Sequence, residues 1–378
     1  MASDTHDISR DQFMLTGRFA KQGYDWWWHS FTGRHAVTGE RRAFFIEFFC
    51  CNPALAENEP VFGQLPANKA AGKKPSYVMV KAGCWGTGAK QLHRFFAWGD
   101  VEVGTGVPFY VLADDCLCCE TDLIGRVDVS SEEALAHPEW MCDAGSMMWD
   151  LKVDKQIAFN VGYGADAPMR TAQAFEMFWH AEGIKTAYEG TVVLDGEAYV
   201  VEPTTCFGYA DKNWGSDFTS PWVWISSCDL VSSLTGERLG NSALEIGGGR
   251  PKVVGVALER KLLGCLNYEG QVFEFNFSKP WTGSKTAFRC WETDDYIRWH
   301  VDQRTHSARV MTDLTCQKSE MLLVNYEAPD GSKRHNRLWN GGTGKGRVQL
   351  FEKHGRDFKL LDDIRIASAG CEYGEYGK

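Results

Sequence analysis

Apolar and polar residues alternate along most of the chain with a period of two, which is typical of β-strands with one buried face. The segment 147–154 shows this clearly, because apolar residues occupy its odd positions: Met147, Trp149, Leu151 and Val153. Similar alternation predicts strands at residues 296–302, 309–315, 321–326 and 346–351. The main secondary structure is therefore expected to be β.

Two segments carry the turn residues of β-hairpins. Asp195-Gly196 separates two apolar stretches within residues 191–201, and Glu269-Gly270 does the same within residues 266–277. Helical patterns are few. Ser131–His137 predicts one short capped helix, and residues 170–177 fit either a helical turn or a strand.

Many short strands, glycine turns and few helices predict an all-β protein built from antiparallel barrels or sandwiches. The 378 residues exceed one ordinary domain, and a closed barrel of this kind takes roughly 150 residues, so two halves in tandem fit the length. We expect an N-terminal barrel over residues 1–200 and a C-terminal barrel over residues 201–378. Because no Pro- or Ser-rich linker separates them, the halves should pack tightly, with a cavity at their interface.

The aromatic content adds to this picture. The chain has 15 Trp, 22 Phe and 12 Tyr, and so many tryptophans exceed what packing needs. An aromatic-lined cavity is therefore expected. The net charge of -10 disfavours nucleic acid and anionic membrane surfaces as partners, since both require basic patches.

The 13 cysteines are odd in number and show no regular spacing. The first residues are polar, without the apolar core of an export signal, and no apolar stretch approaches 18 residues. We therefore expect reduced thiols and a cytoplasmic protein without a transmembrane segment. The cluster Cys116, Cys118 and Cys119 lacks the paired CxxC spacing of a zinc site, which favours free thiols over a metal.

Two glycine-rich stretches resemble phosphate-binding loops only superficially. The second of them, residues 341–346, lacks the GxxxxGK[ST] spacing, and neither it nor residues 247–249 sits between a strand and a convincing helix. Both are predicted to form turns or bulges of a β-sheet.

The stretch GYADKNWG, residues 208–215, concentrates polar and aromatic groups. In one interpretation Asp211 and Asn213 cap a tight turn and Trp214 fills a gap in the core. In the other the stretch is a strand, so that Tyr209 and Asp211 share one face and point into a cavity. A carboxylic acid in an apolar pocket keeps its proton at neutral pH and can donate it, and aromatic faces then stabilise the cation that forms.

Two further groups are candidates for the same site. Trp179-His180 precedes GYADKNWG with a single hairpin between them, so His180 and Asp211 are expected on neighbouring strands, where His180 has either a structural or a catalytic role. In the run of three tryptophans at 26–28, alternation puts Trp27 on one face of a strand and Trp26 and Trp28 on the other. These side chains form either core or ligand wall.

Residues 209–215, followed by 218–224 and 226–228, resemble the signature of the tocopherol cyclase family: an acid, Lys, Asn, Trp, Gly and then a Trp-rich strand. Residues 23–29 are a looser echo of that family's aromatic opening. Tyr209 and Asp211 with the upstream Trp179 and His180 are also distantly similar to carotenoid 1,2-hydratases. Both resemblances imply a fold of two tandem lipocalin-like β-barrels.

The resemblance implies a cofactor-independent enzyme, without a metal, that protonates a carbon–carbon double bond. Asp211 would be the general acid, and Tyr209 and His180 would position it or accept a phenol proton. Asn213 and Lys212 are expected to shape the local turn, with Asn213 also counted among the substrate-binding residues. The other expected substrate-binding residues are tryptophans: Trp26, Trp27, Trp28, Trp179, Trp214, Trp222 and Trp224.

The implied substrate is a hydrophobic aromatic or isoprenoid molecule, such as a prenylated phenol whose oxygen closes a ring on the cation. If water captures the cation, the enzyme is a hydratase, and a ring-opening isomerase runs the closure in reverse. A non-catalytic lipocalin-like carrier of a hydrophobic molecule is the alternative from a different class, because one fold serves many functions. Peripheral membrane contact is compatible with each of these.

Overall fold

The computed structural model describes residues 7–161, 167–250, 252–253, 256–257, 259–332 and 334–374. Most of these residues lie in antiparallel strands, which confirms the predicted all-β class with barrel-like sheets. Three short α-helices occur within the described residues: α1 (Pro66–Ala70), α2 (Ser131–Ala136) and α3 (Ala167–Ala172). None of the described helices has the length and apolar character needed to cross a membrane.

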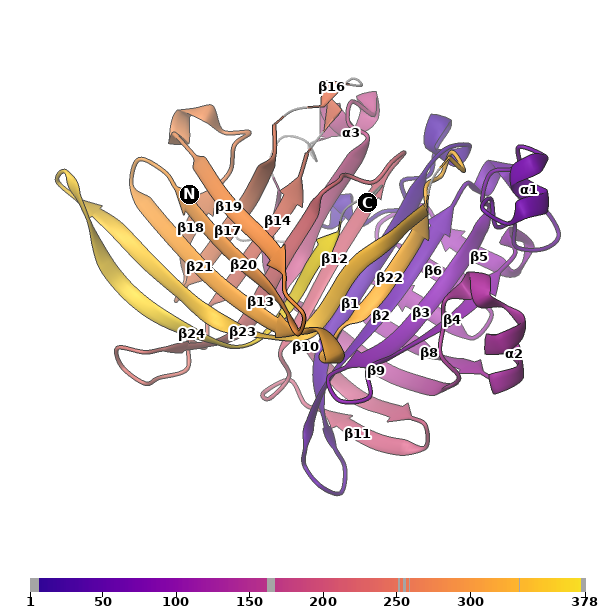
Figure 1. Cartoon of the computed structure of the whole chain (residues 1–378), viewed down its shortest axis with the longest axis horizontal. Coiled ribbons are helices and arrows are strands. Elements are labelled where there is room, and N and C mark those ends of the chain that lie inside the picture. The colour runs from indigo at the N-terminus through magenta and orange to yellow at the C-terminus, as the bar shows by residue number, and fades with distance from the viewer. Residues whose placement is uncertain are drawn as a thin grey trace.

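The first sheet contains the strands from β1 to β12 and runs in the order β4-β3-β2-β1-β11-β10-β9-β8-β7-β6-β5, with β12 paired to β1 and β10. Figure 1 shows it in indigo to pink. Its strands are β1 (Tyr24–His35), β2 (Arg41–Cys51), β3 (Tyr77–Trp85), β4 (Lys90–Phe96), β5 (Val101–Gly104), β6 (Tyr110–Ala113), β7 (Cys116–Cys119), β8 (Asp122–Val129), β9 (Gly145–Phe159), β10 (Met177–Leu194), β11 (Glu197–Val201) and β12 (Gly208–Gly215).

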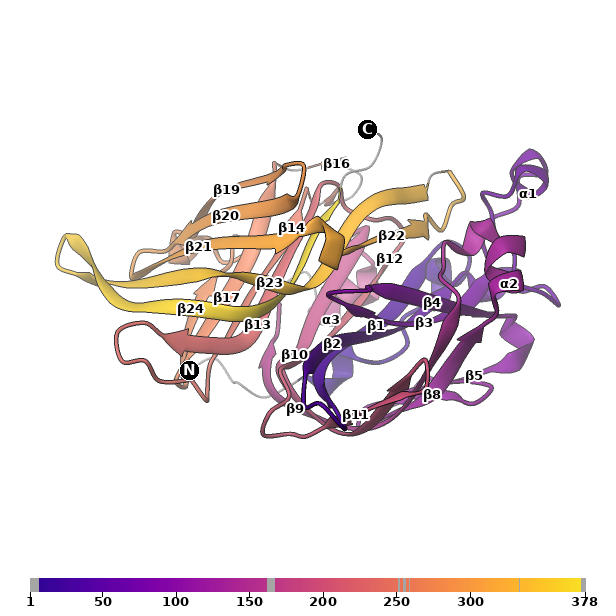
Figure 2. The same cartoon turned by 60° about the horizontal axis from the view of Figure 1, so that its bottom comes forward.

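The second sheet runs in the order β18-β17-β14-β13-β24-β23-β21-β20-β19, with β22 paired to β23. It lies beside the first sheet, in pink, orange and yellow (Figures 1 and 2). Its strands are β13 (Trp222–Ser232), β14 (Ala243–Gly249), β17 (Lys261–Tyr268), β18 (Gln271–Phe275), β19 (Lys285–Glu292), β20 (Tyr296–Arg304), β21 (Ala308–Gln317), β22 (Leu322–Glu327), β23 (Arg334–His354) and β24 (Asp357–Gly374); β15 (Lys252–Val253) and β16 (Val256–Ala257) pair separately.

Local sequence signals identified several elements correctly. Asp195 and Gly196 connect β10 to β11 with φ of 50° and 86°, and Glu269-Gly270 connects β17 to β18 in the same way. Helix α2 begins with a capping box formed by Ser130 and Glu133. The ambiguous segment 170–177 is divided, because α3 ends at Ala172 and β10 begins at Met177.

The two glycine-rich stretches differ. The pairing of β23 with β24 shifts register between Gly341 and Gly346, which confirms the predicted bulge. Residues 247–249, in contrast, pair residue by residue with β17 inside β14, so the prediction of a turn or bulge is wrong there. A Cβ atom on Gly247 would lie 2.6 Å from the Trp179 ring, and this close approach explains a glycine within a regular strand.

The GYADKNWG stretch is a strand and not a turn. All eight residues of β12 are buried, and the strand pairs with Tyr24–Ser30 of β1 on one side and with β10 on the other. β12 lies between β1 and β10 along one part of their length, and β11 lies between the same two strands along another part. The expectation that this stretch lies in the C-terminal barrel is therefore wrong, because β12 completes the first sheet; residue 200 as a domain boundary stays a prediction.

The described residues form three hydrophobic cores in this arrangement. One lies inside the first sheet and includes Trp27, Trp149 and Trp214, and another lies inside the second sheet around Trp299. The third is formed by residues of both sheets, among them Trp28, Phe45, Tyr209, Trp224, Tyr326 and Leu338. We call this third core the middle core. It is where the two halves of the chain share buried surface.

Lys212 on β12 belongs to the first-sheet core. Its ammonium group pairs with Asp25 of β1, both side chains are fully buried, and the nitrogen lies 3.6 Å from the centre of the Trp27 ring. The second oxygen of Asp25 accepts a hydrogen bond from the backbone N–H of Met14 at 2.7 Å. The predicted turn-shaping role of Lys212 is therefore wrong: the pair joins the N-terminal segment, β1 and β12.

Replacing Lys212 by Ala should lower the free energy of unfolding by about 3–5 kcal/mol, because it leaves the Asp25 carboxylate buried without its cation. Urea denaturation followed by tryptophan fluorescence measures the loss. The control is Lys73→Ala, which breaks an exposed ion pair with Glu57 and should cost at most about 1 kcal/mol. Equal losses in the two variants would contradict the structural role of the buried pair.

Candidate functional site

A cavity opens within the middle core, between the two sheets. Including its mouth, it contains about 550 Å³ of space between atoms. Most of its wall is aromatic or aliphatic, and its few polar groups include the two carboxyl groups of Asp211 and Glu372. The lining residues are Trp26, Trp28, Met177, Asp211, Asn213, Phe218, Thr219, Trp222, Trp224, Tyr326, Leu338 and Glu372.

Asp211 is held from one side only. Its Oδ2 atom accepts hydrogen bonds from the Tyr209 hydroxyl at 2.9 Å and from the Trp179 indole N–H at 2.8 Å. Its Oδ1 atom is buried and has no hydrogen-bond partner within the described residues. The predicted placement of Tyr209 and Asp211 on one face of a strand is observed, because β12 alternates regularly.

Burial raises the pKa of Asp211 to about 7. The hydrogen bonds from Trp179 and Tyr209 oppose this rise, because they favour the carboxylate. The nearby carboxyl groups of Glu372 and Glu47 add to it, because their charges disfavour a further negative charge. The acid can therefore hold its proton near neutral pH.

The indole of Trp179 depends on the second sheet for its position. Its ring lies against Gly247 of β14, where a Cβ atom would approach to 2.6 Å. It also meets the Trp222 ring edge-on at 6.1 Å between centroids. A contact between the two sheets therefore aims the N–H group at Asp211, although Trp179 and Asp211 both belong to the first sheet.

Tyr209 bridges two acids. Its hydroxyl oxygen lies 2.9 Å from Asp211 Oδ2 and 3.2 Å from Glu245 Oε1, and the Trp224 indole N–H donates to the same Glu245 oxygen at 2.8 Å. A phenol has one hydrogen, so Tyr209 donates it to one acid at a time. Burial raises the pKa of Glu245 well above its usual value.

His180 lies on the strand next to Asp211, as predicted, but on the opposite face. Its two ring nitrogens lie 2.8 Å from Asp11 Oδ1 and 3.0 Å from Asn160 Oδ1. Because side chains alternate along β10, the face that directs Trp179 toward Asp211 directs His180 away from it. The structure does not bring His180 together with Asp211 and Tyr209.

The expected tryptophans divide in the same way. Trp26, Trp28, Trp222 and Trp224 line the cavity. Trp27 and Trp214 belong to the first-sheet core, where they stack on Phe109 and Phe178 at 5.1 and 5.3 Å between centroids. Asn213 lines the cavity, and its Oδ1 atom accepts a hydrogen bond from the Tyr24 hydroxyl at 2.9 Å.

Sequence reasoning missed Glu372, which comes from β24 of the second sheet. It accepts hydrogen bonds from the Trp222 indole N–H at 2.6 Å and from the Asn340 side chain at 2.6 Å, one on each oxygen. Burial raises its pKa to about 7. No motif surrounds this residue in the chain, so its place in the cavity wall was visible only once β24 was paired with β13 and β23.

A buried group of three residues was also missed. Lys81 donates to Glu47 at 2.8 Å, and the Tyr326 hydroxyl lies 3.0 Å from both of them. Tyr326 also lines the cavity, and its ring stacks on Trp26 at 5.2 Å between centroids. The group ties β2 and β3 to β22 across the two sheets.

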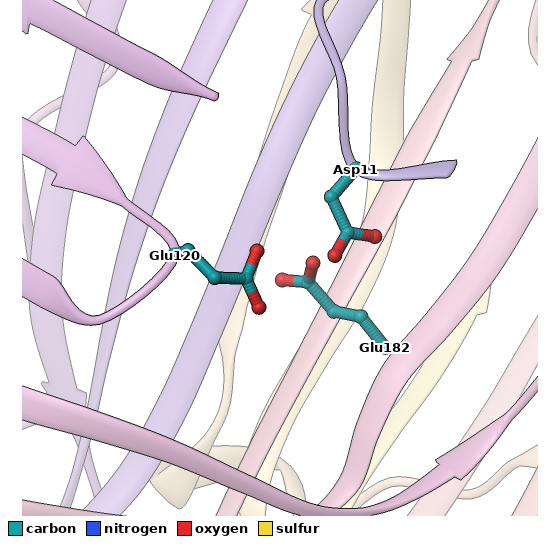
Figure 3. A group of neighbouring side chains, drawn as sticks. All are labelled: Asp11, Glu120 and Glu182. Atoms are coloured by element: carbon teal, nitrogen blue, oxygen red, sulfur yellow. The ribbon is translucent and has the colours of Figure 1, made fainter. Parts of the chain in front are cut away.

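A cluster of acids lies outside the cavity, where Asp11, Glu120 and Glu182 point toward one another (Figure 3). Carboxylates at this spacing could hold a metal ion. However, the Lys155 ammonium nitrogen lies 2.9 Å from both Glu120 Oε1 and Glu182 Oε2, and 3.6 Å from Asp11 Oδ2. The lysine therefore supplies the positive charge that the cluster needs.

Comparison with known proteins identifies the family to which this chain belongs. The tocopherol cyclase-like family model matches residues 140–375. A search of curated proteins gave no match. Among solved structures, kievitone hydratase from Nectria haematococca is 10% identical with a TM-score of 0.47, covering 100% of this chain and 96% of that one. An AttH candidate from Nitrosomonas europaea is 12% identical with a TM-score of 0.44, covering 100% and 99%. Because the family model matches more than half of its length, the chain belongs to the tocopherol cyclase-like family.

Proposed function

We propose that this protein is an acid-catalysed enzyme in which protonated Asp211 adds a proton to a carbon–carbon double bond of a prenylated phenol or related isoprenoid. One observation carries the proposal. Asp211 is buried in an aromatic-walled cavity with Oδ2 held by two donors and Oδ1 free of hydrogen bonds within the described residues. Within the described part of the chain, a proton on Oδ1 has no acceptor that would compete with a bound alkene.

In the first step the alkene π electrons take the proton from Asp211 and form a C–H bond at the less substituted carbon. The adjacent carbon becomes a tertiary cation, and Asp211 becomes a carboxylate. The hydrogen bonds from Tyr209 and Trp179 stabilise that negative charge. The faces of the four lining tryptophans attract the cation and lack an oxygen or nitrogen lone pair that could capture it.

In the second step a hydroxyl oxygen of the substrate attacks the cation and closes the ring. The C–O bond forms, the O–H bond breaks, and the released proton returns to the enzyme to replace the one that Asp211 gave to the alkene, so the product is an isomer of the substrate. Neither step uses an oxidant or a reductant, so the proposed reaction needs no redox cofactor. If water attacks in place of the phenol, the same first step leads to a tertiary alcohol.

Asp211→Asn should reduce product formation by at least about 100-fold and leave ligand affinity within a few-fold, because the amide keeps the shape of the acid and lacks its acidic proton. Mass spectrometry of small molecules extracted from the purified proteins measures the outcome. A prenylated phenol should accumulate on the variant and its cyclised isomer on the wild type.

The control for this experiment is Asp362→Asn, which changes a buried acid of β24 that accepts hydrogen bonds from Ser232 and Tyr268 outside the cavity. It should behave as the wild type. The same unaltered compound on wild type and Asp211→Asn would identify a carrier and contradict the proposed reaction.

The raised pKa of Asp211 also predicts a pH dependence of stability. The folded state retains a proton, with a pKa of about 7, that the unfolded chain releases near its ordinary value of 3.8. Stability from this group is therefore complete at low pH and is lost as pH rises to about 7, by about 1.4 kcal/mol for each unit of difference between the two pKa values.

Urea denaturation of wild type and Asp211→Asn at a series of pH values from about 4 to about 8 isolates this effect, because the other titrating groups are common to both proteins. The stability of the wild type relative to the variant should fall across this range. A constant difference would show that Asp211 is already ionised at low pH and would contradict its role as the acid.

A further inference from the structure

Glu372 is the second carboxyl group in the cavity wall, and it comes from the other sheet. Asp211 lies on β12 of the first sheet and Glu372 on β24 of the second. Resting on the function proposed above, we propose that Glu372 is a second catalytic residue, the base that accepts the proton of the attacking hydroxyl group. The cavity would then select substrates that carry both an alkene and a hydroxyl group.

Hydrogen bonding suits the two acids to opposite roles. Both oxygens of Glu372 accept from N–H groups, one from Trp222 and one from Asn340, and neither group can accept a proton in return. Each oxygen of Glu372 thus accepts one hydrogen bond, as suits an ionised carboxylate. Each oxygen also keeps one free lone pair that can accept a proton. Asp211 has both donors on one oxygen, which leaves the other to carry a proton.

Charge reinforces this division. The negative charge of Glu372 raises the pKa of Asp211, so an ionised Glu372 favours the protonated form of its neighbour. Burial raises the pKa of Glu372, the hydrogen bonds from Asn340 and Trp222 lower it, and the Glu47 carboxylate opposes ionisation more than the Lys81 ammonium favours it. Charge therefore favours one proton for the two acids, and the hydrogen-bond geometry, with both donors on Asp211 Oδ2 and one donor on each oxygen of Glu372, places that proton on Asp211 Oδ1.

The other titratable groups near the cavity are less suitable as the base. Tyr326 lines the wall, but its hydroxyl is already bonded to Lys81 and Glu47, and burial raises its pKa well above the usual value. Glu245 lies behind Tyr209 and Trp224 and does not line the cavity. Among the described lining residues, Glu372 is the acceptor left for the hydroxyl proton.

The proposed cycle balances. Asp211 loses its proton to the alkene carbon, the hydroxyl oxygen forms the C–O bond, and its proton moves to Glu372. After the product leaves, water entering the cavity carries a proton from Glu372 back to Asp211. The net reaction is an isomerisation, and each acid regains its starting protonation state.

The test uses the full-length protein and a geranylated hydroquinone as the probe substrate. For the wild type, activity should fall at high pH as Asp211 loses its proton and at low pH as Glu372 gains one, which gives a bell-shaped profile of kcat/KM. Glu372→Gln should lower kcat about 100-fold with KM nearly unchanged, and the fall of activity at low pH should disappear. A purely structural role would not remove only that limb.

Asp362→Asn, on the same strand, is the control and should keep both limbs of the profile. Since the amide introduced by Glu372→Gln would place an N–H group against Trp222 or Asn340, the melting temperature of the variant is measured as well. If Glu372→Gln does not fold, Glu372→Asp replaces it, and this variant should be slower but retain the low-pH limb.

The outcomes separate the two proposals. If Glu372→Gln keeps full activity and an unchanged profile while Asp211→Asn is inactive, Glu372 is not the base and the proposed function stands. Loss of the low-pH limb only in Glu372→Gln supports Glu372 as the base. If Asp211→Asn is fully active, or the wild type does not convert the probe, the proposed function fails and the role of Glu372 fails with it.

Discussion

The middle core depends on hydrogen bonds from indole N–H groups to buried carboxyl groups. Among the described residues the arrangement occurs three times: Trp179 donates to Asp211, Trp224 to Glu245 and Trp222 to Glu372. An isolated carboxyl group buried among aromatic rings would cost several kcal/mol. An indole offsets this cost with a donor that is part of the apolar wall, so the cavity can contain acids without water-filled polar surroundings.

Glycines in the second sheet make this arrangement sterically feasible. A Cβ atom on Gly247 would lie 2.6 Å from the Trp179 ring, and one on Gly370 would lie 2.3 Å from the Trp224 ring. The Trp179 ring therefore lies directly on the backbone of the facing sheet, and the Trp224 ring lies on the backbone of the neighbouring strand β24. These close contacts bring the N–H groups of both rings within reach of the acids. The relative position of the two sheets and the hydrogen bonding of the Asp211 carboxyl group are thus physically linked.

The two faces of strand β12 contact different cores. Tyr209, Asp211 and Asn213 face the middle core, whereas Lys212 and Trp214 face the first-sheet core, where Lys212 is paired with Asp25. The structural face holds β12 in place between β1 and β10, and the other face supplies the acid. A short stretch rich in charged and aromatic residues is therefore compatible with a fully buried strand.

The sequence by itself determined the all-β class, the two Gly hairpins and the shared face of Tyr209 and Asp211, because these follow from local alternation and turn chemistry. The signature of residues 208–228 also identified the family. The tertiary structure alone decided that β12 closes the first sheet, that His180, Trp27 and Trp214 face away from the cavity, and that Glu372 joins Asp211. These positions depend on pairing between strands that are far apart in the sequence. The local pattern of apolar and polar residues does not specify which distant strands become neighbours.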